Sequence, residues 1–297
     1  MPVHVRRVVV GAVLVGLVLA AGCKTEVVTP PAAPPIPPVP IGTRVAWILR
    51  LEQQRVLRDA GVVPGEAAPP AASRLRPARY ADLVGLVNDL DAPVRRRAAL
   101  AIGRVGRPEG VPALTAALTD ADDDVKGAAA FGLGLIGDKS GVEPLEGALK
   151  DPSAAVRARA IEGLGLIGDT GAAPAVAAAA AGCRAALAGI APDDEGYPKS
   201  PEIELCRVAL FALVRLKNYD ALATVALDER GMPISRWWPV AYALQRIGDK
   251  RAAPALLTLA SGDGIYTPAF ALRGLAAAKE DRKSTRLNSS HVSESRM

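Results

Sequence analysis

The sequence predicts an all-α fold, an α-solenoid built from about six helix pairs that recur every 31 residues. Three columns of residues repeat at this spacing: Val94, Val125 and Val156; Ile102, Leu133 and Leu164; and Gly106, Gly137 and Gly168. Half of the 297 residues are hydrophobic, but only 4% are aromatic. The core must therefore consist mainly of Ala, Leu, Val and Ile, and such small side chains indicate closely packed helices.

Each 31-residue unit is predicted to contain two helices. In one second helix, apolar residues at i, i+4, i+8 and i+11 mark a single helical face: Val156, Ala160, Leu164 and Ile167. The Asp-Pro-Ser run at 151–153 predicts the start of this helix, with a capping side chain and a proline in the first turn. Gly168 predicts its end. The first helix of each unit is the short apolar segment that follows the glycine, as at 110–114 and 141–145.

The repeat domain is predicted to span 79–280. After a gap of 49 residues, which is one period plus an insertion of 18, the glycine column continues at three positions: Lys217, Gly248 and Lys279. We place the insertion at 183–200, because 192–198 is a turn-forming, solvated stretch. Upstream, residues 42–78 are expected to hold one further helix, over 45–60, and a linker rich in Pro and Ala.

The stretch at 151–169 reads Asp-Pro-x-x-x-Val-Arg-x-x-Ala-x-x-x-Leu-Gly-x-Ile-Gly-Asp and resembles the short HEAT-like repeats of the phycobilisome-lyase type. The resemblance covers about 80–280 and implies a solenoid of HEAT-like helix pairs. It also implies a ladder of hydrogen bonds between repeats, made by Asp89, Asp120 and Asp151 with Arg95, Lys126 and Arg157. In the second half the motif is replaced by Gly-Met-Pro at 231–233 and a Trp pair, so the resemblance there depends on spacing and apolar pattern.

Residues 1–22 are predicted to be a lipoprotein signal peptide. Arg6 and Arg7 precede an apolar run of about 14 residues, which is too short to span a membrane and typical of a signal-peptide core. The run ends in Leu-Ala-Ala-Gly-Cys, which resembles the lipobox of bacterial lipoproteins. The resemblance implies that Cys23 is lipidated and, with Lys24 behind it, that the chain faces the periplasm from the outer membrane of a bacterial envelope. A soluble secreted protein and an uncleaved anchor are the alternatives.

The two ends of the chain differ from the repeats in composition. Residues 23–41 form a Pro-rich tether, which favours extended polyproline II, and we interpret it as a linker without a recognition role. Residues 281–297 lack the repeat pattern and resemble the translation of a sequencing adapter, with a genuine disordered tail as the alternative. Without 1–22 and 281–297 the formal charge falls from +5 to +1, so the basicity does not belong to the repeats.

Catalytic chemistry has little support in the residue types present. The two histidines, His4 and His291, lie near the ends, which removes His-based catalysis and metal binding from the repeats. A cysteine nucleophile would lack a His base. With Cys23 assigned to lipid, Cys183 and Cys206 are expected to form a disulfide in an oxidising compartment, and two buried free thiols are the alternative. We predict no enzymatic activity, no cofactor and no metal.

Two kinds of ligand motif match as text but not in their expected structural context. The stretches 132–137 and 163–168 fit the dinucleotide fingerprint, but they lie within and at the end of a predicted helix, so we interpret their glycines as close helix packing. The stretch 120–124 begins like a calcium loop. Val125 then stands where glycine is needed and Phe131 where Glu is needed, so a solvated turn that caps the next helix is expected.

The side of the second helices that points away from the core is predicted to bind a partner. At 100° per residue, positions 96, 100 and 104 point away from positions 94, 98 and 102. Through six repeats these three columns collect six arginines, four aromatic residues and one acid, Glu162. The candidate binding residues are Arg96, Arg104, Phe131, Arg207, Phe211, Arg215, Trp238, Tyr242, Arg246 and Arg273. Arginine and aromatic residues are typical of interface hot spots, and the second helices of HEAT-like solenoids line the concave side.

The leading hypothesis is a non-catalytic scaffold or adaptor that binds a protein or peptide carrying acidic groups. The alternative for the site is that Phe131, Phe211 and Tyr242 pack between repeats while the arginines solvate a face. The alternative function is an accessory subunit of an enzyme that handles a chromophore or cofactor, as lyases of the resembling type do. Nucleic acid is not an expected partner, because export argues against it, and the lipid anchor is the only membrane contact expected.

Overall fold

A computed structural model describes residues 39–60 and 80–279 of the chain. The predicted signal peptide, Cys23, most of the tether, the linker at 61–79 and the tail at 281–297 lie outside the described residues. The described part contains helices and two isolated β-bridges but no β-strand. None of its helices combines the length and the apolar sequence that crossing a membrane requires.

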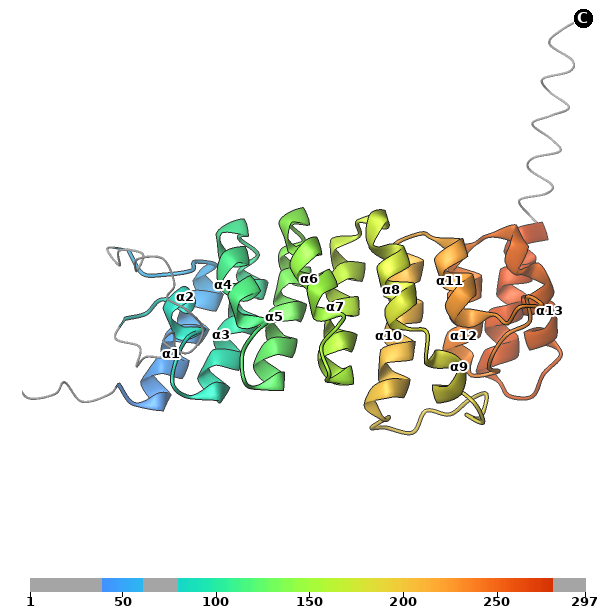
Figure 1. Cartoon of the computed structure of the whole chain (residues 1–297), viewed down its shortest axis with the longest axis horizontal. Helices are drawn as coiled ribbons and strands as arrows, with labels where there is room; N and C mark the ends of the chain where they lie inside the picture. Colours follow the sequence, from blue (N-terminus) through green and yellow to red (C-terminus); the bar gives the residue numbers. More distant parts are fainter. Residues whose placement is uncertain (1–38, 61–79, 280–297) are drawn as a thin grey trace, which may run out of the picture. The chain divides into compact units, whose positions relative to one another are not determined.

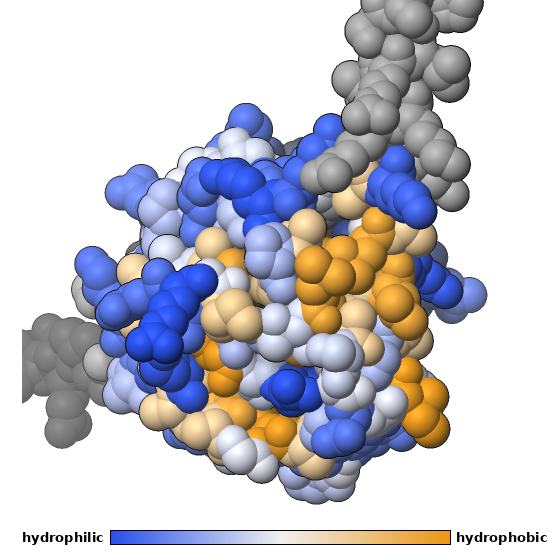
Figure 2. All heavy atoms as spheres, turned by 90° about the vertical axis from the view of Figure 1, so that its right-hand side faces the viewer, coloured by the Kyte–Doolittle hydropathy of each residue, from blue (hydrophilic) through white to orange (hydrophobic). Residues whose placement is uncertain are grey.

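Six helix pairs follow one another among the described residues, which confirms the predicted α-solenoid. The first helices are α2 (Leu83–Leu86), α4 (Val111–Ala117), α6 (Val142–Ala148), α8 (Ala173–Ala179), α11 (Tyr219–Ala226) and α13 (Ala253–Ala260). The second helices are α3 (Ala92–Val105), α5 (Asp123–Ile136), α7 (Ala154–Ile167), α10 (Pro201–Arg215), α12 (Trp238–Ile247) and a helix over 266–279. They lie side by side in chain order (Figure 1), and Figure 2 views the end of this row that the last pair forms.

The glycine column marks the ends of the second helices. Gly106, Gly137, Gly168 and Gly248 have φ between 69° and 76°, the left-handed conformation that ends a helix. Lys217 occupies the same column and has a φ of 52°. A lysine therefore adopts a backbone conformation that glycine adopts in the other repeats.

Lys217→Gly is expected to raise the free energy of unfolding by about 1 kcal/mol, because a left-handed residue with a Cβ is strained by about 1–2 kcal/mol and the flexibility of glycine in the unfolded chain offsets part of the gain. Urea unfolding measures the change. Lys150→Gly, at an exposed position where φ is negative, is the matched control and should not stabilise. Equal effects of the two substitutions would contradict the account.

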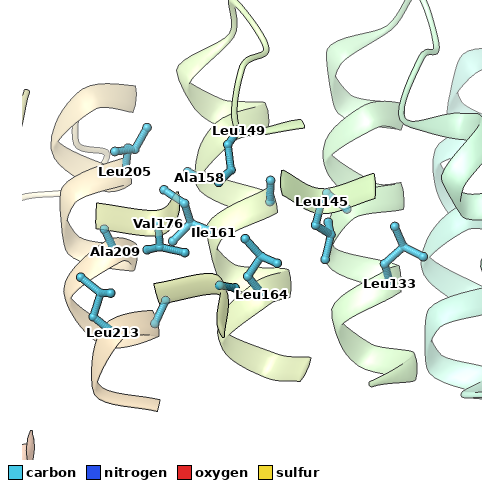
Figure 3. Close-up of a cluster of buried hydrophobic side chains, with 14 of the residues drawn as sticks. Leu133, Leu145, Leu149, Ala158, Ile161, Leu164, Val176, Leu205, Ala209 and Leu213 are labelled. Atoms are coloured by element: carbon cyan, nitrogen blue, oxygen red, sulfur yellow. The ribbon is translucent and has the colours of Figure 1, made fainter. Parts of the chain in front are cut away.

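The core runs between the two rows of helices. Leu133, Leu145, Leu164, Val176 and Leu213 come from α5, α6, α7, α8 and α10 in that order, and each is at most 1% exposed. Figure 3 shows these side chains following one another through the interior of the stack. Each pair thus buries its apolar face against its neighbours, as expected for repeats that contact only the next repeat.

Glycines bring neighbouring second helices into close contact. A Cβ atom built on Gly103 would lie 2.5 Å from the Cα atom of Gly132, and one built on Gly134 would lie 2.5 Å from that of Gly163. No side chain fits at such a distance. In the two stretches that resemble a dinucleotide fingerprint, four glycines are therefore helix-packing residues and the last glycine of each stretch ends its helix: Gly132, Gly134, Gly163 and Gly165 pack, and Gly137 and Gly168 end α5 and α7.

The ladder between repeats is present where its acids and bases both occur. Arg95 binds the Asp120 carboxylate through two hydrogen bonds of 2.8 Å, and Lys126 binds Asp151 at 2.8 Å. Arg157 differs, because it donates only to backbone carbonyls at 151 and 152. In the next repeat, the position equivalent to Asp89, Asp120 and Asp151 is Ser200, which has no charge and cannot form an ion pair.

The start of α7 differs from the prediction. The helix begins at Ala154, so Pro152 precedes the first turn, and the Ser153 side chain makes no capping hydrogen bond. Instead the Asp151 side chain accepts a hydrogen bond of 2.8 Å from the Ser153 backbone N–H. The ladder acid therefore also orders the turn before the helix.

The N-terminal helix α1 spans Ile41–Gln54 rather than 45–60. Arg44 on this helix forms ion pairs with Asp89 and Asp91, and the Arg44 Nη2 to Asp91 Oδ2 distance is 2.6 Å. The Arg44 side chain is 8% exposed and that of Asp89 is fully buried. The ladder thus continues from the first pair onto α1, which covers this end of the repeats.

The insertion is more ordered than a solvated turn. It contains α9 (Cys183–Ala186), and its loop contacts the two pairs that follow α10. Trp238 N–H donates to the Pro192 carbonyl at 2.8 Å, and Trp237 Nε1 donates to the Asp194 carbonyl at 2.9 Å. The Asp193 carboxylate accepts hydrogen bonds from the backbone at 265 and 266, where the last helix begins. The loop therefore links three successive repeats.

Cys183 and Cys206 form a disulfide with an S–S distance of 2.08 Å. The two residues are 1% and 2% exposed and join the start of the insertion to α10. Because the bridge spans 23 positions, it holds the ends of the insertion together and restricts its loop.

Candidate protein-interaction face

The ten candidate binding residues lie on five second helices, α3, α5, α10, α12 and the helix over 266–279. We call the exposed side of these helices the second-helix face. Five of the arginines are exposed there: Arg96, Arg104, Arg215, Arg246 and Arg273. The other five candidates are half-buried: Phe131, Arg207, Phe211, Trp238 and Tyr242.

Four aromatic side chains form a contiguous cluster across the last three second helices. Phe211 and Tyr242 have ring centroids 5.3 Å apart in an edge contact, and Tyr242 meets Phe270 at 5.4 Å. Trp238 lies 6.0 Å from Phe270 and 6.4 Å from Phe211. These contacts pack neighbouring repeats together, and they leave part of each ring on the second-helix face. Phe131 lies apart from the cluster, with the Arg159 guanidinium 5.6 Å from its ring centroid.

The fixed 31-residue register missed Phe270. Counting from Trp238 places position 269 in the outward column, but Ala269 is exposed and its neighbour Phe270 packs against the cluster. Arg159, the residue of the same column in α7, likewise packs on an aromatic ring of the second helix before it, that of Phe131. An aromatic residue one position from the column was the available signal.

Three of the six candidate arginines form ion pairs with acids of the chain itself. Arg96 pairs with Asp124 at 3.0 Å, and Arg104 pairs with Glu52 of α1 at 2.9 Å. Arg207 binds the Glu204 carboxylate one turn before it, with an Nε to Oε2 distance of 2.9 Å. This hydrogen bonding holds the pKa of Glu204 below its usual value, although burial opposes the shift.

The other three arginines have no ion pair or side-chain hydrogen bond to another residue in the described ranges. They are Arg215 and Arg246, at equivalent positions near the ends of α10 and α12, and Arg273 in the last helix. Arg215 and Phe211 line one hollow of the second-helix face together with Glu162. The uncompensated positive charge therefore gathers beside the aromatic cluster, in the last three repeats.

Residues of the insertion lie at the edge of the second-helix face, a position that the sequence did not predict. Tyr197, Pro198 and Lys199 line a hollow together with Arg159 of α7 and Glu204 of α10. Tyr197 is 89% exposed. A partner that reaches the hollows of α7 and α10 would therefore also meet the insertion.

The described residues contain no group of three or more His, Cys, Asp or Glu side chains placed to hold a metal ion. The carboxylates at 120–124 each have a protein partner. Asp120 binds Arg95, Asp122 caps α5 through the Val125 N–H at 3.0 Å, and Asp124 binds Arg96. The turn orders the helix start and the contacts between repeats.

Sequence comparison identifies HEAT repeats at residues 80–130 and 111–188 and a PBS lyase HEAT-like repeat at residues 240–262. The helix pairs in these segments are thus of the HEAT class. No curated protein matches the sequence significantly.

Three solved structures illustrate the similarity of fold. The complex of CpcE and CpcF of phycocyanin lyase from Nostoc sp. PCC7120 is 24% identical, with a TM-score of 0.48 over 74% of this chain and 82% of that chain. A designed armadillo repeat protein in complex with the peptide (KR)4 is 18% identical, with a TM-score of 0.35 over 66% and 80%. Human deoxyhypusine hydroxylase in complex with glycerol is 15% identical, with a TM-score of 0.29 over 82% and 100%. These similarities concern the fold alone.

Proposed function

We propose that the chain is a non-catalytic scaffold or adaptor, anchored by a lipid on Cys23 to a bacterial cell envelope and facing the periplasm. Its repeats would bind a protein or peptide segment carrying acidic groups on the second-helix face. The lipobox-like residues at 19–23 support the anchor, and the HEAT repeats support a scaffold because solenoids of this class offer extended binding surfaces.

One observation carries the proposed binding site. Within the described residues, Arg215, Arg246 and Arg273 have no acid partner, and they lie beside the half-buried cluster of Phe211, Trp238 and other aromatic side chains. A carboxylate of a partner can form charge-assisted hydrogen bonds with these guanidinium groups. The exposed parts of the rings can cover apolar atoms of the same segment. The binding centre is therefore proposed in the last three repeats.

An accessory role in an enzyme is the weaker proposal. The PBS lyase HEAT-like match covers only residues 240–262. Glu162, the acid that such a role would need on the second-helix face, is bound by Arg159 at 2.8 Å. No residue of the described part favours chromophore chemistry over protein binding.

The proposed binding site predicts unequal effects of two matched double variants. The full chain would be used to purify partners from its native membrane, with mass spectrometry to identify and quantify them. Arg215→Ala with Arg246→Ala is expected to reduce capture of the main partner by about tenfold or more, because uncompensated charges face the partner. Arg96→Ala with Arg104→Ala should have a much smaller effect, because those arginines already form ion pairs with Asp124 and Glu52.

The choice of variants leaves the aromatic cluster intact, so the repeats should keep their packing. Circular dichroism and thermal unfolding check that both double variants fold as the parent does. Capture that is undiminished in the first variant, or reduced equally in both, would contradict the proposed site.

A further inference from the structure

Two hollows of the second-helix face adjoin and form one groove between α7 and α10. The first is the hollow beside the insertion, and the second is the hollow that Phe211 and Arg215 line. Glu162 of α7 and Val208 of α10 line both of them. We call this surface the α7–α10 groove. It extends from Pro201, at the start of α10, to Arg215, at the end of the same helix.

The insertion forms one wall of the α7–α10 groove, and contacts with its neighbours hold this wall in place. Its loop runs along the lower edge of the stack to the start of α10 (Figure 1). Lys199 pairs with the Asp194 carboxylate at 2.6 Å, and the Asp194 carbonyl accepts the hydrogen bond from Trp237. The disulfide fixes the start of the insertion to α10. A partner therefore meets a preformed wall, which reduces the entropic cost of binding.

The half of the groove beside the insertion has no unpaired charge among the described residues. The charged side chains that line this half all belong to ion pairs: Arg159 with Glu162, Glu204 with Arg207, and Lys199 with Asp194. The other lining residues include Ala155, Ala158 and Val208, whose side chains are apolar. This half therefore suits an apolar side chain of a partner better than a charged one.

Tyr197 supplies an aromatic surface at this end of the groove. Its side chain is almost fully exposed, although neighbouring residues of the insertion are held by the contacts described above. Tyrosine offers a large contact area at a low cost in conformational entropy and is typical of interface hot spots. Pro198 beside it adds a second rigid ring. An apolar residue packed on these two rings would remove them from water.

The opposite end of the groove carries unpaired positive charge. Arg215 lines it and has no ion pair or side-chain hydrogen bond to another residue in the described ranges. From Pro201 to Arg215 the helix rises by about 21 Å. An extended segment covers that distance with about seven residues, at about 3.3 Å for each. The groove therefore presents an apolar contact and a cationic contact at the separation of a short peptide segment.

We propose that the partner binds through an extended segment of about seven residues that lies along the α7–α10 groove. An apolar side chain at one end of the segment packs on Tyr197 and Pro198, and a carboxylate at the other end binds Arg215. The groove thereby selects an apolar residue and an acid at a fixed separation, rather than acidic character alone. This specificity rests on the proposed function, because the groove belongs to the same binding face.

Photo-crosslinking from position 197 of the full chain tests where the segment lies. Benzoylphenylalanine in place of Tyr197 keeps an aromatic ring there, and irradiation in the native membrane joins it to whatever touches it. Mass spectrometry of the crosslinked peptide identifies the segment. We expect one segment of the main partner, with an apolar residue at the crosslink and an Asp or Glu about five to nine residues away. The same probe in place of Tyr80, which is 65% exposed outside the groove, should not crosslink that segment.

Tyr197→Ala measures the contribution of the apolar contact. Capture of the main partner is expected to fall at least about fivefold, because the variant removes the aromatic surface at one end of the segment. Tyr80→Ala is the matched control and should leave capture unchanged. Tyr197 is exposed, so the variant should fold, and circular dichroism checks this.

The arginine variants separate failure of the groove from failure of the binding face. Suppose that Arg215→Ala with Arg246→Ala reduces capture, but position 197 gives no crosslink to the main partner or Tyr197→Ala leaves capture unchanged. The groove is then overturned and the proposed function stands. A crosslinked segment with no Asp or Glu within about ten residues would overturn the groove in the same way. Capture that is undiminished in the arginine variant would overturn both.

Discussion

Gly134→Ala is expected to lower the free energy of unfolding by about 3 kcal/mol, although the change adds a single methyl group. The new Cβ atom would lie 2.5 Å from the Cα atom and 3.1 Å from the carbonyl oxygen of Gly163. Both are backbone atoms, so α5 and α7 must move apart, and the core side chains between them lose contacts. The better helix propensity of alanine, worth about 1 kcal/mol, offsets only part of this cost.

Gly147→Ala supplies the matched control for this prediction. Gly147 lies in α6, where a Cβ atom would meet nothing within 4 Å. The control should therefore raise the free energy of unfolding by about 0.5–1 kcal/mol through helix propensity and the unfolded state. Urea unfolding of both variants gives the comparison. If Gly134→Ala were as stable as the parent, the stacking of the second helices would be looser than the structure has it.

The period of 31 predicts most of the fold because each repeat contacts only its neighbours. Under that condition, equivalent positions have equivalent surroundings, and the column of Gly106, Gly137 and Gly168 locates the ends of α3, α5 and α7. Lys217 illustrates this rule. The register places Lys217 at the end of α10, and its φ of 52° lies in the left-handed region that the glycines of the column also adopt. Even an atypical residue is thus positioned by the spacing alone.

The net charge of the candidate site could not be predicted from the periodicity. The acid that neutralises Arg104 is Glu52, on a helix outside the repeats, and the acid for Arg207 is Glu204, in a different column of its own helix. A column count of six arginines and one acid therefore overstates the positive charge of the second-helix face. The insertion escapes the periodicity for a similar reason, because Asp193 and Asp194 contact repeats that lie far along the chain.

Arg44→Ala is expected to destabilise the N-terminal end of the stack by about 3 kcal/mol. Arg44 is 8% exposed and binds Asp89, whose side chain is fully buried, and Asp91. The substitution removes the guanidinium that binds the buried Asp89 carboxylate, and taking a charged partner away from a buried carboxylate is costly. It also removes the alkyl part of Arg44 from the contact between α1 and the first pair. The loss should therefore appear first as detachment of α1.

Hydrogen exchange can follow that detachment directly, with backbone amides of α1 losing protection before those of α5 and α7. Arg50→Ala is the control on the same helix, since Arg50 pairs with Asp59 at 2.6 Å but the two side chains are 46% and 34% exposed. A surface pair of this kind contributes at most about 1 kcal/mol, so the control should unfold almost as the parent does. Equal effects of the two substitutions would mean that α1 is held by its apolar contacts alone. A larger effect of Arg44→Ala instead makes the first ladder position the point where the N-terminal helix is fastened to the repeats.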